Sequence, residues 1–155
     1  MKYRQLTKEQ FESLHEEFSK FLATQGVDFN EWKKIKEQQP ALAENELNLF
    51  SDIVWEDVLK RAEYLEHFSK NTINLFECKE DKISRIVIKV HKEVDLLTQN
   101  DYNWLLENYD SEDVELFNGT KNYSSERNIE IFDLIEKGSA ISKGDLYNFF
   151  EKIIS

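Results

Sequence analysis

The feature that most constrains the fold is a change of hydrophobic period partway along the chain. Apolar residues first recur at helical spacing, and three short segments rich in aromatic and β-branched residues follow. These segments are predicted strands at 64–68, 73–78 and 83–90, and polar residues at 70–71 and 80–81 supply the turns between them. Because such short turns join antiparallel neighbours, the sequence predicts an antiparallel meander.

Helices are predicted before this meander. Thr7 and Gln10 have the spacing of a capping box, and the helix that they begin ends before Gly26. A second, short helix precedes Pro40. The third covers about 41–61 and is apolar around so much of its circumference that we expect it to be central in the fold. Whether a new helix starts at Ser51 stays open.

More helices and one strand are predicted after the meander. Thr98 caps a helix, and two further helices close the chain, the last of them beginning near Ser142. Between them, residues 114–117 form a strand. The following Asn118-Gly119 is either the turn of a hairpin or a bulge in one longer strand that ends near Tyr123.

The order of these elements predicts the fold class. Strands cluster instead of alternating with helices, which favours an α+β fold over a parallel α/β sheet. We expect N-terminal helices, a mainly antiparallel sheet of three to five strands, and C-terminal helices. The chain has 155 residues and contains neither a linker nor an internal repeat, so it is predicted to form a single domain over residues 1–155.

The charge and the cysteine count limit the partners and the compartment. A net charge of −11 disfavours binding to nucleic acid or to an anionic membrane, since both attractions depend on lysine and arginine. No apolar run approaches the roughly 20 residues of a membrane span. The single cysteine, Cys78, excludes an internal disulfide. Together with the absence of a secretory signal, this predicts a cytoplasmic protein with no nucleic-acid or membrane partner.

No motif identifies catalytic residues. The order helix, three strands, helix, strand resembles the core of the PD-(D/E)xK nucleases, and Glu77-Cys78-Lys79 fits their acidic-x-Lys triplet. A chain with this many acids and lysines is expected to contain about three such triplets by chance, which is what it contains. On the third predicted strand, where the family pattern places the triplet, Val87 occupies the position of the acid. We therefore expect no bound metal and no cofactor.

An enzyme built from scattered polar residues is the alternative function. Its candidates are His67, His91 and Glu77, which would have to converge on one concave pocket, with or without a metal. Cys78 alternates with Phe76 along its strand, which predicts a buried and unreactive thiol.

Two sets of residues are candidates for an interaction surface. The first is a basic stripe on the outer face of the third strand, which would receive an acidic partner or pair with Glu77 across the strand; its members are Arg85, Lys89 and His91. The second is the apolar stripe of the last helix, which would dock on its own domain or on another subunit; its members are Phe149, Phe150, Ile153 and Ile154.

Charge is segregated along the chain. Residues 1–92 carry a net charge of −2, whereas residues 93–155 carry −9. The acidic loop 110–115 follows the basic stripe in the sequence, and we expect the two to pair within one fold or between two copies.

Three segments carry a resemblance to a known family. They are MKYRQLTKEQ at the start, LFSDIVWEDVLKRAEYLEH in the middle, and ERNIEIFDLIEKGSAISKGDLYNFF near the end. The chain resembles a small, uncharacterised bacterial protein family, a domain of unknown function, over nearly its whole length. This resemblance implies a single-domain cytoplasmic protein and brings no activity, ligand or catalytic residue. The hypothesis that the sequence favours is a non-enzymatic interaction module that binds another protein or itself.

Overall fold

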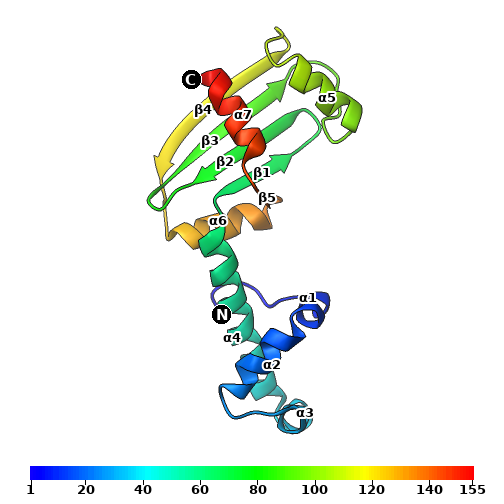
Figure 1. Ribbon diagram of the computed structural model, residues 1–155, viewed down its shortest axis with the longest axis vertical. Coiled ribbons are helices and arrows are strands. Elements are labelled where there is room, and N and C mark those ends of the chain that lie inside the picture. The colour runs from blue at the N-terminus through cyan, green and yellow to red at the C-terminus, as the bar shows by residue number, and fades with distance from the viewer. The chain divides into compact units, whose positions relative to one another are not determined.

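The fold consists of seven helices and a five-stranded antiparallel sheet, which confirms the predicted α+β class (Figure 1). The computed structural model describes residues 1–155. The chain divides into two compact units, an N-terminal unit of residues 1–60 and a C-terminal unit of residues 61–155. A single domain over residues 1–155 stays a prediction.

The N-terminal unit is helical. The predicted capping box is present, because the Thr7 side chain accepts from the Gln10 backbone and the Gln10 side chain accepts from Thr7. The single helix expected after Thr7 is wrong, since Leu14 leaves helical geometry (φ −109°, ψ 23°) and splits it in two. The helices of this unit are α1 (Lys8–Ser13), α2 (His15–Ala23), α3 (Phe29–Gln38) and α4 (Pro40–Arg61).

Helix α4 is continuous through Ser51, so no new helix starts there. The Ser51 hydroxyl donates to the Leu47 carbonyl (2.7 Å) and accepts from the backbone N–H of Leu6 (3.0 Å), so it is buried without an unmet hydrogen bond. The wide apolar face predicted for this helix is only partly correct. Phe50 is buried, whereas Ile53 is 55% exposed.

Aromatic rings fill the core of the N-terminal unit. Phe18 meets Trp32 edge to face at 5.2 Å between ring centroids and lies 5.0 Å from Phe50. Leu22 and Ala43 complete the cluster from α2 and α4. The helices are therefore held together by apolar packing, as their amphipathic patterns predict.

The C-terminal unit is built on the sheet. The three predicted strands form the expected antiparallel meander, with boundaries within one residue of the prediction. The strand order is β4-β3-β2-β1-β5. The elements of this unit are β1 (Tyr64–Phe68), β2 (Thr72–Cys78), β3 (Lys82–Val90), α5 (Gln99–Glu107), β4 (Val114–Asn122), α6 (Arg127–Glu136), β5 (Ala140–Ser142) and α7 (Asp145–Ile154).

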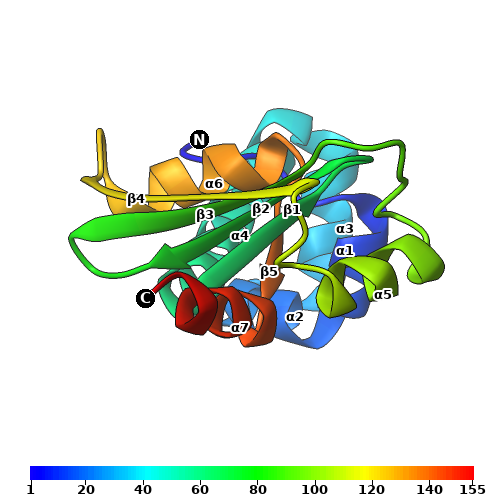
Figure 2. The same cartoon turned by 90° about the horizontal axis from the view of Figure 1, so that it is seen from above.

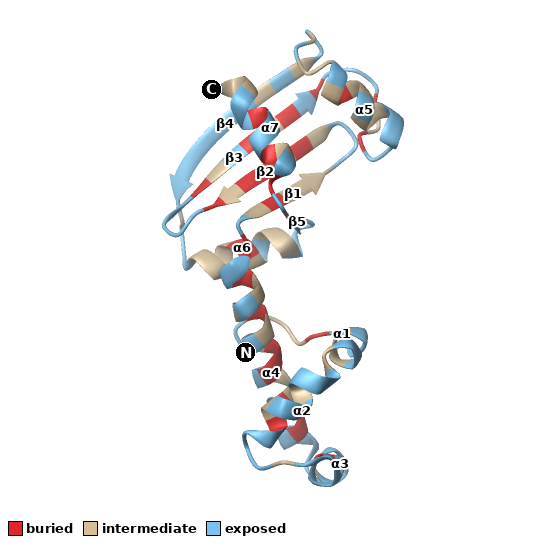
Figure 3. Cartoon of the chain, in the orientation of Figure 1, coloured by how far each residue is buried: buried red, intermediate tan, exposed pale blue.

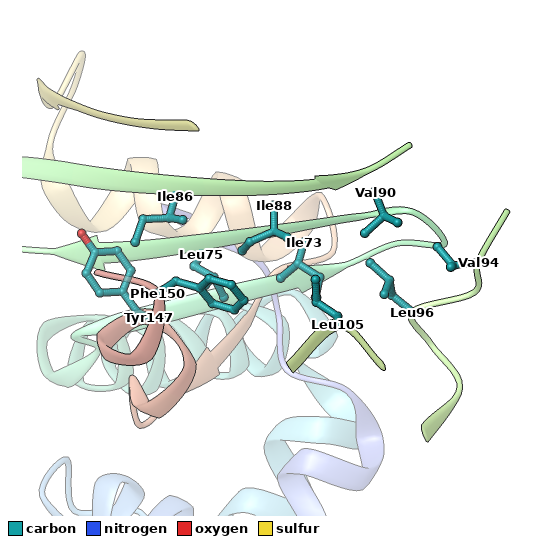
Figure 4. Packing of buried hydrophobic residues seen from close by; sticks show 10 residues of the cluster. All are labelled: Ile73, Leu75, Ile86, Ile88, Val90, Val94, Leu96, Leu105, Tyr147 and Phe150. Carbon is teal, nitrogen blue, oxygen red and sulfur yellow. The ribbon is translucent and has the colours of Figure 1, made fainter. Parts of the chain in front are cut away.

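The two faces of this sheet are covered differently. Helices α5 and α7 lie on one face, which we call the covered face, and α6 lies on the other, which we call the open face (Figure 2). Alternation along β3 sends Ile86 and Ile88 into the covered face. There they pack with Leu105 of α5 and Phe150 of α7, forming the main core of the unit (Figure 4).

Both predictions for Asn118-Gly119, a hairpin turn and a bulge, are wrong, because these residues lie within the regular strand β4. Every residue from Val114 to Asn122 pairs with one residue of β3, and Gly119 pairs with Arg85 without a bulge. Gly119 is not among the glycines with positive φ, so its backbone is extended. The longer strand in which the bulge was expected is present, and it ends at Asn122, one residue before the predicted end.

Two short features near the C-terminus differ from the prediction. Ser142 does not cap the last helix; it ends the three-residue strand β5, which pairs with β1 at the edge of the sheet. Gly144 takes the cap position instead, with φ +87°. No helix in the structure combines the length and the apolar character needed to span a membrane.

Candidate functional site

The open face forms a groove with helix α6. The groove has a volume of about 870 Å³ and lies entirely within the C-terminal unit. Its wall is more apolar than polar. The apolar side chains come from β2, β3, β4 and α6, and they are Phe76, Ile83, Val87, Phe117 and Leu134. Phe117 is 46% exposed, so the side of the groove along β4 presents an aromatic surface to solvent.

Arg85 is a cation held against the apolar wall. Its Nε and Nη2 both donate to Oδ1 of Asn74 at 3.0 and 2.5 Å, and its guanidinium lies 5.7 Å from the centroid of the Phe76 ring. These contacts fix the orientation of the guanidinium over the aromatic ring. Because Asn74 and Phe76 are neutral, the positive charge of Arg85 has no carboxylate partner.

Helix α6 supplies the other charged groups of the groove. Glu130 forms an ion pair with Lys121 of β4 and also accepts from the backbone N–H of Ser124 at 3.0 Å. Lys137 and Asp133 line the groove one helical turn apart, and Lys137 is exposed and forms no ion pair. The groove therefore carries two cations, Arg85 and Lys137, whose charge no acidic side chain neutralises through an ion pair.

The predicted basic stripe lies on the open face, but its members have different surroundings. Arg85 lines the groove, while Lys89 is exposed further along β3, across from Glu115 of β4. His91 contacts Glu115 with 2.6 Å between Nε2 and Oε1. The expected pairing with Glu77 is wrong, because Glu77 points to the covered face, where it accepts from the Tyr64 hydroxyl at 3.2 Å.

The acidic loop and the basic stripe meet within one chain at a single point. Besides the His91–Glu115 contact, the backbone N–H of His91 donates to the carbonyl of Asp113 at 2.7 Å. The far end of the stripe, beyond Lys89, therefore has Glu115 as an acidic neighbour.

The second predicted surface, the apolar stripe of α7, docks on the sheet of its own unit. Phe150 is fully buried against β2 and β3, so it belongs to the core and cannot contribute to an outer surface. Phe149 is 39% exposed and meets Tyr109 edge to face at 5.7 Å. Ile153 and Ile154 are partly buried against the same core.

The candidates for an enzyme site are not brought together. His67 lines the groove, packed under Gly138 of the loop after α6, whereas Glu77 lies on the opposite face of the sheet and His91 pairs with Glu115. No group of three or more histidine, cysteine, aspartate or glutamate side chains in the structure could hold a metal ion. The trio therefore does not form a common site.

Cys78 is buried on β2 near Tyr123 and Arg127. Burial raises the pKa of its thiol to about 11, with smaller contributions from neighbouring charges. Tyr123 donates its hydroxyl to the Lys79 carbonyl (2.8 Å), and burial raises the pKa of Tyr123 to about 12. Arg127 donates to three carbonyls that end β2 and precede β1, namely those of Lys79, Cys78 and Ala62.

We expect the native Cys78 thiol to be alkylated slowly by iodoacetamide at pH 8. Only the thiolate attacks, and a thiol with a pKa near 11 holds roughly a hundredfold less thiolate at that pH than one with a pKa near 9. Mass spectrometry of timed samples measures the rate, with the urea-unfolded chain as the reference. The native rate should keep rising up to about pH 11, and equal native and unfolded rates at pH 8 would contradict this result.

The groove residues on α6 were not found from the sequence. Lys137, Asp133 and Leu134 contribute to it only because the α6 segment packs over a sheet face to which β2 and β3, far earlier in the chain, contribute beside β4. The one sequence signal was the outward position of Arg85 on β3, which correctly marked the open face. The helix that completes the groove had no such signal.

The comparisons with known proteins identify a family and no activity. No curated protein and no solved structure matches the chain. One family model, described as a family of unknown function (DUF6495), matches residues 1–155, the whole chain. This confirms the resemblance to an uncharacterised family. The chain belongs to the DUF6495 family of unknown function.

Proposed function

We propose that this chain is a non-enzymatic, cytoplasmic protein-interaction module, and that the groove of its C-terminal unit binds an acidic segment of a partner protein. The observation that carries the proposal is Arg85, an oriented cation without an acidic partner on an apolar wall. The absence of internal disulfides, with the single Cys78 buried, supports a reducing compartment.

The shape of the groove supports a segment with apolar side chains. Phe76, Val87 and Phe117 come from three adjacent strands, with Val87 directly opposite Phe117 and diagonal to Phe76, so they form an apolar strip across the sheet. Side chains of a bound segment would remove this strip from water, which contributes about 25 cal/mol for each Å² of apolar surface. Arg85 and Lys137 line the same groove and would orient the segment.

The charges support an acidic partner. The C-terminal part of the chain is strongly acidic, with −9 over residues 93–155, yet Arg85 and Lys137 are both unneutralised in the groove. A carboxylate that reaches either cation would gain charge-assisted hydrogen bonds. A basic segment would be repelled by both cations and attracted only by Asp133, the one acidic groove residue besides Glu130, which is already paired with Lys121.

Fluorescence polarisation with two synthetic peptides tests the proposal. One peptide of roughly nine residues alternates glutamate with phenylalanine and valine, and its control carries lysine in place of each glutamate. We expect the full chain to bind the acidic peptide at least about tenfold more tightly than the basic one, which corresponds to about 1.4 kcal/mol. Equal affinity for the two peptides would contradict the proposal.

Charge-reversed variants locate the site. The double variant Arg85→Glu/Lys137→Glu should lose at least about tenfold in affinity for the acidic peptide, since it removes both of these groove cations. The matched control is Lys152→Glu on α7, an exposed lysine outside the groove, which should change the affinity less than about twofold. An equal loss in the control and in the double variant would show attraction by net charge alone and would refute the groove.

A further inference from the structure

Strand β4 is a free edge of the sheet. It occupies the end of the strand order and pairs over all nine of its residues with β3. Most of its residues are exposed, as the pale blue strand in Figure 3 shows. It contains neither a proline nor a bulge, two of the devices that commonly blunt such edges. A long, regular edge of this kind is a template for another strand.

The phase of the hydrogen bonds shows which backbone groups face outward. The backbone N–H of His91 donates to the carbonyl of Asp113, which extends the β3–β4 register by one pair. Because bonded and non-bonded pairs alternate in an antiparallel ladder, the odd-numbered residues of β4 bond to β3. The even-numbered residues direct their N–H and C=O groups to the free edge; they are Val114, Leu116, Asn118, Thr120 and Asn122.

We propose that β4 pairs antiparallel with β4 of a second copy of this chain, with Asn118 on the two-fold axis, so that one sheet continues through both copies. In this register the two nine-residue strands overlap over their full length. The outward backbone groups of residues 114 and 122, and of 116 and 120, then face one another and close the ladder.

The side chains of β4 are complementary to themselves in this register. Glu115 lies opposite Lys121 of the second copy, so the charges are matched twice about the axis. Phe117 lies opposite Gly119, whose open flank can take an aromatic ring, since nothing lies within 4 Å of a Cβ built there. Both pairs occupy non-bonded positions of the new ladder, where opposing side chains are closest.

Neighbouring registers lose this match. A shift of the register by two residues in one direction places Glu115 opposite Gly119. The same shift in the other direction places Phe117 opposite Lys121. Each shift also shortens the ladder. In their own chain, Lys121 already pairs with Glu130, and Glu115 with His91. In the dimer, Lys121 of the second copy would lie beside the Glu115–His91 pair, and Glu115 of the second copy would lie beside the Lys121–Glu130 pair. Each pair would then belong to a small network of charges.

The surroundings of β4 leave room for a second strand. On the covered face, α7 packs on β2 and β3. On the open face, Phe117 of the second copy would lie beside Gly119, which lines the groove, so each copy would lengthen the apolar wall of the other's groove. The inference goes beyond the proposed function, because self-association through β4 does not depend on a bound peptide.

Sedimentation equilibrium of the full chain tests the pairing. The mass should rise from 18.5 kDa toward twice that value between roughly 10 µM and 1 mM. Asn118→Pro should abolish this rise, because proline removes an outward N–H at the axis and leaves the β3 ladder intact. Asn118→Ala keeps the N–H and should retain the dimer. Circular dichroism of each variant confirms that it is folded.

Charge swaps give a second test that does not involve proline. Glu115→Lys and Lys121→Glu should each weaken the dimer, since each places like charges opposite one another in the pair. An equimolar mixture of the two variants should restore association, because every opposing pair is then of opposite sign. A chain that stays monomeric throughout, a dimer indifferent to Asn118→Pro, or a mixture no stronger than its components would each overturn the proposal.

Discussion

Replacing Phe150 with alanine is expected to lower the free energy of unfolding by about 3–5 kcal/mol. Its side chain is fully buried and packs where α7 meets β2 and β3, against Ile73, Leu75 and Ile88 (Figure 4). Alanine would leave a cavity in the centre of this core, and the strands around it cannot collapse to fill the space because their backbones are fixed by pairing on both sides.

The neighbouring Phe149 provides the matched control. It is the same residue type on the same helix, but it is 39% exposed, so Phe149→Ala should cost no more than about 1–2 kcal/mol. Urea unfolding of the full chain, read from hydrogen exchange of the β2 and β3 amides, measures the C-terminal unit directly. Equal losses in the two variants would contradict the central position of Phe150.

Gly144→Ala is expected to cost about 2–3 kcal/mol, for two additive reasons. Gly144 has φ +87°, a conformation that strains any other residue. A Cβ at this position would also lie 2.4 Å from Cδ2 of Tyr64. Tyr64 cannot move away freely, because its ring packs against Tyr147 with 5.6 Å between centroids and its hydroxyl donates to Glu77.

Gly119→Ala is the control for this substitution. Its backbone is extended and a Cβ there meets nothing within 4 Å, so the variant should be within about 0.5 kcal/mol of the parent chain or slightly more stable. Both variants are compared by the same hydrogen-exchange measurement. A Gly144→Ala chain as stable as the Gly119→Ala chain would show that Tyr64 and the cap relax at little cost.

The strands of the meander could be predicted because their signals are local. Along β3, each outward residue such as Arg85 alternates with an inward one such as Ile86, and the register with β2 follows from the short turns. The caps at Thr7 and Thr98 were predictable for the same reason, since the side-chain acceptor and the backbone N–H that donates to it lie three residues apart.

Features set by distant partners were not predictable. Asn118-Gly119 has a strong local preference for a turn, yet nine paired residues of β3 hold it extended. The three residues of β5 are too few to show a period and form a strand only because β1 offers an edge. Nothing in the residues around Leu14 marks the break between α1 and α2.

The candidate site shows the same division. The alternation of residues along β3 was enough to place Arg85 on the open face, but it did not show that Asn74 is the hydrogen-bond partner of Arg85. Asn74 is reached across the β2–β3 ladder, and Lys137 is brought to the groove by the packing of α6. On α7, Phe149 and Phe150 are adjacent in an unbroken apolar stripe, and only the tertiary contact with the sheet decides that Phe150 is the buried one.

The most direct test of the account is an NMR titration of the ¹⁵N-labelled full chain with the acidic peptide. The account predicts that the Nε–H resonance of Arg85 and the amides of Phe117, Gly119 and Leu134 shift together and saturate at one affinity, because these groups line one groove. Shifts confined to α5 and α7 on the covered face, or to the N-terminal unit, would contradict it, as would a titration in which Arg85 does not respond.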